Sequence, residues 1–254
     1  MIFHVHIPKT AGTALNQHVL LHAFPRADIC LLYDGPKRQD VLAQMSVEQL
    51  RSLKLVLGHV PYGFLTPFKV PAVHLSLFRE PDSRFGSYVN FLMSEPRHGF
   101  WYQSGITFGS ADGDTIVRAI SRLPHFRLRH QGVMTKLAAG LQLSEQVHEE
   151  DWPGLVGRAV ENLRRDDYLW GLQDRFTDFC TMLHSRFGLV YHDQPFALEQ
   201  MSKKRPVTPD DVAAATKRFD HKFRFADLST DTKALAADLN RYDYQLYERL
   251  LAMA

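Results

Sequence analysis

Short apolar segments bounded by turn-forming residues recur along the chain. Residues 2–7 alternate apolar and polar positions, and this period of two predicts a strand. Residues 28–33 form a second run of the same length that also predicts a strand. The runs at 53–57 and 73–78 are mainly apolar, which is typical of strands buried on both faces of a sheet. Residues 168–172 are expected to add another strand.

Helix signals alternate with these strands in the first half. The turn at residues 8–12 ends the first strand, and Thr13 is suited to cap the helix that follows. Residues 46–49 have the spacing of a capping box. A helix predicted over 81–94 opens on a proline, which the first helical turn tolerates well. Strands that alternate with helices in this order predict a parallel α/β sheet.

The second half is mainly helical by the spacing of its apolar residues. Helices are predicted at residues 114–123, 133–141, 155–166, 175–187, 208–219 and 231–252. Residues 96–113 contain four glycines and predict a long loop or lid. Because no repeat or linker divides the chain, we expect a single domain over residues 1–254.

Composition excludes several classes of protein. The 254 residues are 45% hydrophobic and 23% charged, which excludes collagen, coiled coil and wholesale disorder. No run of about 18 apolar residues is present, so no membrane span is expected. Cys30 and Cys180 have neither disulfide-framework nor zinc spacing, and Lys9 interrupts any secretory signal. We therefore expect a soluble, cytoplasmic protein with reduced thiols.

The net charge of +2 gives no indication of nucleic-acid binding, but positive charge is unevenly distributed. Residues 117–136 contain no acid. Their cations are Arg118, Arg122, Arg127, Arg129 and Lys136, and a second cluster consists of Lys203, Lys204 and Arg205. Runs of this kind form either solvated faces or anion sites.

A turn of small residues lies between the first predicted strand and helix. It consists of Pro8, Lys9, Thr10, Ala11, Gly12, Thr13 and Ala14. Backbone N–H groups beside a helix N-terminus form a cradle for phosphate or sulfate, to which the Lys9 ammonium and the threonine hydroxyls add donors. A Walker A loop has glycine directly before its lysine, and Pro8 occupies that position. The turn predicts either another kind of anion site or an ordinary strand-to-helix corner.

A second candidate group surrounds the end of the fourth predicted strand. Arg79 lies at the carboxyl edge, where open α/β sheets bind ligands. Ser87 follows two helical turns later, so the two side chains could share one phosphate. Arg84 suits the same face or the helix surface, and Arg79 could instead form an ion pair with Glu80 or Asp82.

Together these two segments resemble motifs of the carbohydrate sulfotransferase family, in the branch that includes heparan 2-O-sulfotransferase and its bacterial relatives. HIPKTAGTA at residues 6–14 is similar to the family's phosphosulfate loop HIPKTGGTS, from which it departs at Ala11 and Ala14. REPDSRFGSYV at residues 79–89 is similar to the 3′-phosphate motif RDPxxRFxSxY, with Glu80 in place of aspartate. Weaker likeness follows in the family's order over nearly the whole chain.

The resemblance implies a three-layer fold like that of P-loop NTPases, with a central parallel sheet and helical elaborations in the C-terminal half. It implies an enzyme that transfers a sulfuryl group from 3′-phosphoadenosine 5′-phosphosulfate (PAPS) to an acceptor hydroxyl, without a metal, and releases adenosine 3′,5′-bisphosphate (PAP). The implied donor-binding residues are Pro8, Lys9, Thr10, Ala11, Gly12, Thr13, Ala14, Arg79 and Ser87, with Lys203, Lys204 and Arg205 as a basic segment over the nucleotide.

The catalytic residues implied are His59 and Lys9. Residues 55–60 resemble the family's GHVxF segment, whose histidine is taken as the base that deprotonates the acceptor. An imidazole with an ordinary pKa near 6.5 suits that work at neutral pH. Lys9 would stabilise the leaving phosphate oxygen. The alternative for His59 is a structural histidine, which is the interpretation favoured for His4 and His6.

The acceptor is expected to be a carbohydrate or a small molecule with a free hydroxyl. An insertion at about 96–150 would form a lid or bind the acceptor, with Phe100, Trp101 and Tyr102 stacking on sugar faces or packing against their own helices. The cations of residues 118–136 could receive an anionic glycan.

Two other functions stay open. A small-molecule kinase on the same sheet needs an aspartate at a strand end to hold Mg²⁺, and the corresponding positions are His59 and Arg79. A non-catalytic nucleotide-binding module would not need Lys9 and His59 together.

Overall fold

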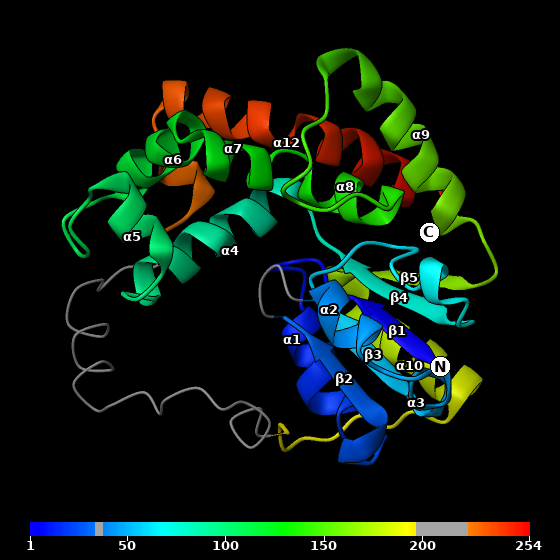
Figure 1. Ribbon diagram of the computed structural model, residues 1–254. Helices are drawn as coiled ribbons and strands as arrows, with labels where there is room; N and C mark the ends of the chain where they lie inside the picture. Colours follow the sequence, from blue (N-terminus) through cyan, green and yellow to red (C-terminus); the bar gives the residue numbers. More distant parts are fainter. Residues whose placement is uncertain (34–37, 197–222) are drawn as a thin grey trace.

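The computed structural model describes residues 1–33, 38–196 and 223–254. Within these residues, five parallel strands form one sheet in the order β2-β3-β1-β4-β5 (Figure 1). The strands are β1 (Ile2–Val5), β2 (Ile29–Leu32), β3 (Leu55–Gly58), β4 (Val73–Phe78) and β5 (Tyr168–Leu172). The protein is therefore an α/β protein with a parallel central sheet, as predicted.

Alternation along the strands supplies two buried faces. Leu55, Leu57 and Leu75 contact the helical segments α1 (Gly12–Leu15), η1 (Asn16–Leu20) and α10 (Phe176–Phe187). Phe3 and Val56 lie on the opposite face. That face is covered by α2 (Arg38–Ala43), α3 (Val47–Ser52), α8 (Val133–Ala139), α9 (Trp152–Leu163) and α12 (Thr230–Leu251). Because apolar side chains leave both faces, helices are required on both.

A layer of helices lies over the carboxyl ends of the strands (Figure 1). This layer contains α4 (Pro81–Ser94), α5 (Gly99–Ser104), α6 (Gly113–Arg122) and α7 (Pro124–His130). These helices share a second hydrophobic core with α12, which contains Phe85, Phe100 and Ile120. The layer covers the carboxyl edge of the sheet, and the candidate site lies between the layer and this edge.

The boundaries of β4 and α4 coincide with the predicted 73–78 and 81–94, and the expected strand at 168–172 is present. The capping box of α3 is also present, with both reciprocal hydrogen bonds of Ser46 and Gln49. The predicted helix at 208–219 lies outside the described residues. The predicted loop at 96–113 is wrong in part, because α5 forms there.

Helix α5 is stabilised by a local hydrogen bond and by long-range packing. The His98 ring accepts a hydrogen bond from the Phe100 amide at the helix start, and Phe100 and Trp101 are buried in the second core. The glycines that flank this short helix led to the prediction of a loop. The helix forms because tertiary burial, rather than helix propensity, stabilises it. The short helices α2 and α7 were not predicted either.

No helix among the described residues has the length and apolarity needed to cross a bilayer. Cys30 is buried and Cys180 is half-buried, and neither forms a disulfide.

Candidate functional site

The three candidate segments lie at the carboxyl ends of adjacent strands. β1 is hydrogen-bonded between β3 and β4, and these strands lead into the 8–14 turn, His59 and Arg79. The backbone N–H of His6 continues the ladder by donating to the Gly58 oxygen over 2.9 Å. Segments separated by more than forty positions in the sequence are therefore neighbours at one edge of the sheet.

The 8–14 turn has an unusual backbone. Lys9 and Ala11 have φ angles of 69° and 67°, in the left-handed region that glycine adopts most easily. The Leu15 amide donates to the Ala11 oxygen, so the N–H groups of Thr13 and Ala14 precede the first intrahelical bond. These N–H groups at the start of the helix have no intrahelical acceptor, and such groups can donate to a bound anion.

Two residues of the turn have structural tasks. A Cβ atom at Gly12 would lie 2.2 Å from Cδ2 of His6, so only glycine fits against that ring. The Thr10 hydroxyl is buried and donates to the Ile7 carbonyl over 2.9 Å. The expectation that Thr10 offers its hydroxyl to a ligand is therefore wrong, whereas Thr13 is exposed and lines the cavity described below.

His59 is oriented by the main chain of the first motif. Its Nδ1 lies 2.6 Å from the backbone carbonyl oxygen of His6. A carbonyl oxygen can only accept, so Nδ1 carries the proton and the basic lone pair is on Nε2. The rings of His6 and Tyr33 flank the imidazole, with centroids 4.5 and 5.0 Å away. The tautomer of His59 is the one that a general base needs.

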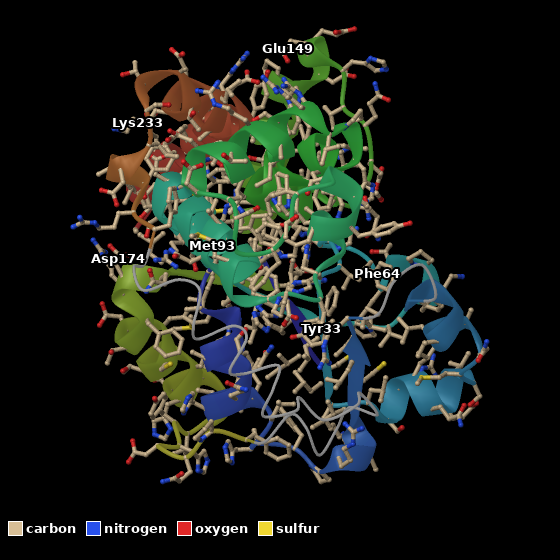
Figure 2. All side chains as sticks on the ribbon, turned by 90° about the vertical axis from the view of Figure 1, so that its left-hand side faces the viewer. Tyr33, Phe64, Met93, Glu149, Asp174 and Lys233 are labelled. Carbon is tan, nitrogen blue, oxygen red and sulfur yellow. The ribbon has the colours of Figure 1, made fainter. Side chains whose placement is uncertain are left out.

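A buried polar chain supports His6. The His4 Nδ1–H donates to Asn16 Oδ1 over 2.6 Å, and the Asn16 amide donates to the Tyr33 hydroxyl over 2.6 Å. The Tyr33 hydroxyl in turn donates to Nδ1 of His6 over 2.8 Å. Tyr33 lies where the sheet meets the helical layer (Figure 2).

Burial keeps this chain of groups neutral. It lowers the pKa of His4 to about 4, and it also lowers the pKa of His6 well below its ordinary value, with the charge of His59 as a second cause. The alternating pattern predicted a strand for His4 and His6, whereas Asn16 and Tyr33 were not identified from the sequence. The signal for Tyr33 was its place as the last residue of the second predicted strand, at residues 28–33.

Arg79 joins the turn to α4. Its Nε donates to the Ser83 hydroxyl over 2.9 Å, and its Nη1 donates to the Lys9 carbonyl over 3.4 Å. The Glu80 carboxylate instead accepts from the amides of Asp82 and Ser83 and so caps α4. Burial lowers the pKa of both Arg79 and Lys9, and the positive charge of Arg79 lowers that of Lys9 further.

Ser83 and Ser87 are four residues apart and share one face of α4. Arg79, Ser83 and Ser87 therefore form a row of donors that starts at the 8–14 turn. Ser87 is half-buried.

Arg84 is not at the helix surface, and that expectation is wrong. Its side chain is 0% exposed, donates to Asn240 Oδ1 over 3.0 Å and lies 3.7 Å from the Asp243 carboxylate. The cation is held between α4 and α12, where burial lowers its pKa. Its direct role is to fasten the helical layer.

A cavity of about 440 Å³ separates the sheet edge from the helical layer. The sheet side contributes His6, Lys9, Thr13 and His59, and the helical side contributes residues of α4, α5, α7 and α8. The Lys9 ammonium crosses toward α4 and lies 4.9 Å from the centre of the Phe91 ring. No aspartate or glutamate is among the described residues that line this space.

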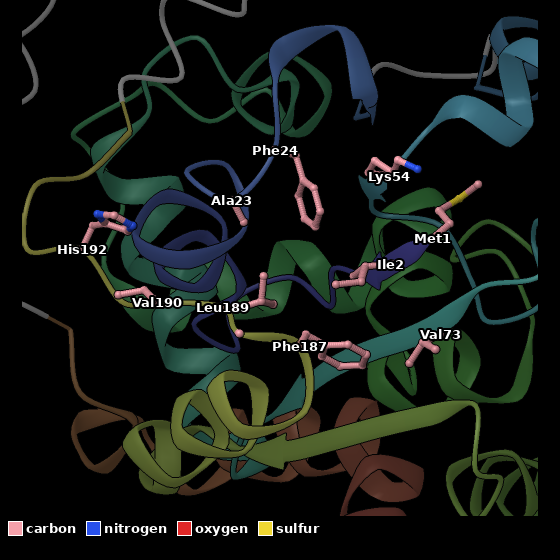
Figure 3. A pocket seen from close by; sticks show the side chains of 11 residues that line it. Met1, Ile2, Ala23, Phe24, Lys54, Val73, Phe187, Leu189, Val190 and His192 are labelled. Carbon is pink, nitrogen blue, oxygen red and sulfur yellow. The ribbon is translucent and has the colours of Figure 1, made fainter.

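A cavity of similar size, about 430 Å³, lies near the amino ends of the strands (Figure 3). It is lined mainly by apolar side chains such as Ile2, Phe24 and Phe187. None of the candidate residues that the structure describes lines it, so it does not bear on the site at the carboxyl edge.

The cationic segment 117–136 does not act as one surface. Lys136 is buried, and its ammonium donates to the carbonyls of Leu128 and Glu145 over 2.8 Å each. Arg127 forms an ion pair with Asp238 at 2.8 Å. Of the five cations in this segment, Arg129 is the one among the described lining residues of the cavity.

The aromatic group at residues 100–102 is also divided. Phe100 and Trp101 are buried, so they pack against their own helices and are not available to stack on a sugar. Tyr102 is 92% exposed. Lys203, Lys204 and Arg205 lie outside the described residues.

Comparison of the chain with models of protein families and with characterised proteins gave no match. The family resemblance therefore stays a prediction that depends on the two motifs.

Proposed function

We propose that this protein is a sulfotransferase that moves a sulfuryl group from PAPS to the hydroxyl of an acceptor, on a sheet of the P-loop NTPase type. The observation that carries the proposal is the arrangement of His59 and Lys9. A histidine whose basic nitrogen is Nε2 and a lysine on an anion-binding turn line the same cavity. Sulfuryl transfer in line needs these two groups on opposite sides of the reacting centre.

Each residue then has a role that follows from its position. The amides of Thr13 and Ala14 hold the phosphosulfate end of the donor, while Arg79 and Ser87 hold its 3′-phosphate. The donor supplies an activated sulfuryl group. Lys9 stabilises negative charge on the oxygen from which this group departs. His59 removes the proton of the acceptor hydroxyl through Nε2.

Two cations at the carboxyl edge of the sheet fit this donor: Lys9 lines the cavity, and Arg79 lies beside the 8–14 turn without being among the described lining residues. Lys9 and Arg79 are close enough for the charge of one to lower the pKa of the other, and like charges held together attract an anion to offset their repulsion. PAPS carries phosphate and sulfate groups that match them. A kinase would use carboxylates to hold Mg²⁺ here, and the strand ends provide His59 and Arg79 instead.

Nucleotide selectivity tests the donor site directly. PAP should raise the melting temperature well above the increase given by AMP or by ATP, with or without Mg²⁺, because only PAP has the 3′-phosphate. Arg79→Ala should remove most of this difference, whereas Arg164→Ala, which changes an exposed arginine at the end of α9, should preserve it. Equal stabilisation by AMP and PAP would contradict the 3′-phosphate assignment, and preference for ATP with Mg²⁺ would favour a kinase.

Transfer of labelled sulfate from PAPS to a panel of carbohydrate and small hydroxyl compounds tests the activity. Transfer that depends on both Lys9 and His59 is the expected result. PAP binding without transfer to any acceptor would indicate a non-catalytic nucleotide-binding module.

A further inference from the structure

The helical side of the 440 Å³ cavity is lined by cationic and aromatic side chains. Arg84, Tyr88 and Phe91 recur at intervals of four and three residues, so they lie on one face of α4. The row of Ser83 and Ser87, which the proposed function assigns to the donor, lies on the adjacent face. Helix α4 thus presents two groups of side chains on adjacent faces.

Arg129 is the exposed cation of this side. It lies in the last turn of α7 and lines the cavity. Its positive charge contributes to the lowered pKa of both His98 and His130, whose own burial is the larger cause. In the part of the chain that the structure describes, no carboxylate forms an ion pair with Arg129.

The wall that Arg129 lines also contains buried polar nitrogens without partners in the described part of the chain, of which those of the Arg84 guanidinium carry positive charge. Among the described residues, Arg84 Nε and Nη1 and His130 Nδ1 are buried without a hydrogen-bond acceptor or donor opposite them. Arg84 and His130 both line the cavity. The Asp243 carboxylate, 3.7 Å from Arg84, is on the far side in α12 and is absent from the described lining. A cavity with buried, incompletely paired positive charge attracts an anion.

Aromatic rings also line this wall. Tyr88 packs on His130 with ring centroids 4.0 Å apart, and Phe91 and Phe126 also line the cavity. Flat side chains suit the face of a ring, either a sugar or an arene. A volume of about 440 Å³ is in the lower part of the range for small-ligand sites, which is roughly 300–1,000 Å³.

We propose that this half of the cavity binds the acceptor, and that the acceptor is a small ring compound that carries an oxyanion, with Arg129 as the residue that recognises that anion. The proposal rests on the proposed function. His59 would meet the acceptor hydroxyl from the sheet side, while Arg129 binds the carboxylate, sulfate or phosphate from the helical side. The row of Arg79 and Ser87 stays with the donor.

Binding to the PAP-saturated protein tests this without turnover. Methyl glucuronide and methyl glucoside share a ring and differ in a carboxylate, so calorimetry should give about 10- to 100-fold tighter binding of the glucuronide. Arg129→Gln should abolish the difference. Arg122→Gln, which changes an exposed arginine outside the described cavity lining, should keep it. Both variants should bind PAP and melt as the parent protein does.

The outcomes separate the two proposals. Failure of PAP to bind would contradict the proposed function itself. Three results with normal PAP binding would overturn the acceptor site alone. They are equal affinity for the two glycosides, no binding of either glycoside, and a preference for the glucuronide that persists in Arg129→Gln. A polyuronate that binds more tightly per residue than methyl glucuronide would overturn the assignment to a small acceptor.

Discussion

The imidazole Nδ1 of His59 donates to the backbone carbonyl oxygen of His6 over 2.6 Å. The bond connects two loops that follow adjacent strands, 53 positions apart in the sequence. Because the acceptor is a backbone atom, mutation of the His6 side chain cannot remove it. The sheet itself therefore fixes the tautomer and direction of His59.

His59→Asn tests the base while preserving this bond, because the asparagine amide can replace the Nδ1 donor but has no basic nitrogen. We expect kcat/KM for sulfuryl transfer to fall by about 10²- to 10⁴-fold. The melting temperature and the affinity for PAP should stay close to those of the parent protein. Transfer at the parental rate would assign the proton to another group.

Lys9→Met tests the charge on the turn. Methionine keeps an unbranched side chain that can lie on Phe91, and it removes the ammonium. We expect kcat to fall by roughly 10²- to 10³-fold, in the range found for loss of one transition-state donor. PAP affinity should fall less, because the backbone amides and Arg79 remain. A loss of PAP affinity with kcat unchanged would indicate that Lys9 acts in binding alone.

Ala11→Gly and Gly12→Ala form a matched pair at adjacent positions. Glycine at residue 11 relieves the strain of a positive φ and should raise the free energy of unfolding by about 1 kcal/mol. Alanine at residue 12 would place Cβ against the His6 ring and should lower stability by more than this. Urea denaturation measures both. Opposite signs are the expected result, and stabilisation by Gly12→Ala would contradict the described packing of His6.

The buried histidines make stability depend on pH. His4 has a pKa of about 4 in the folded protein and 6.5 when unfolded, so between these values the unfolded chain binds more protons. The contribution of His4 to stability is complete above pH 6.5 and falls by roughly 3 kcal/mol as pH decreases to 4. His6, His74 and His130 shift in the same direction.

His4→Asn isolates this effect, since the asparagine amide can still donate to Asn16 but does not titrate. Urea denaturation from pH 7.5 to 4.5 should give a shallower pH dependence for the variant than for the parent protein. The matched change at exposed His148 should leave the dependence as it is. An identical pH dependence in His4→Asn would contradict the burial of His4 as its cause.

The sequence by itself determined the features that depend on local interactions. Alternation and apolar runs predicted the strands, and the capping box at Ser46 and the opening proline at residue 81 predicted helix starts, because caps and periodicity act within one or two turns. The small-residue turn was also predictable, whereas the positive φ angles of Lys9 and Ala11 were not, because neither residue type signals a left-handed backbone.

Only the tertiary structure decided which charged and polar side chains belong to the site. Arg84, Arg129 and Lys136 are all cations in helices, but their surroundings differ. Arg84 donates to Asn240, which is 156 positions away in the sequence, Arg129 lines the cavity, and the Lys136 ammonium donates to backbone carbonyls. The tautomer of His59 depends on a carbonyl of another loop. Local pattern cannot supply such partners, because the free energy of a buried charge depends on the groups that the whole fold places around it.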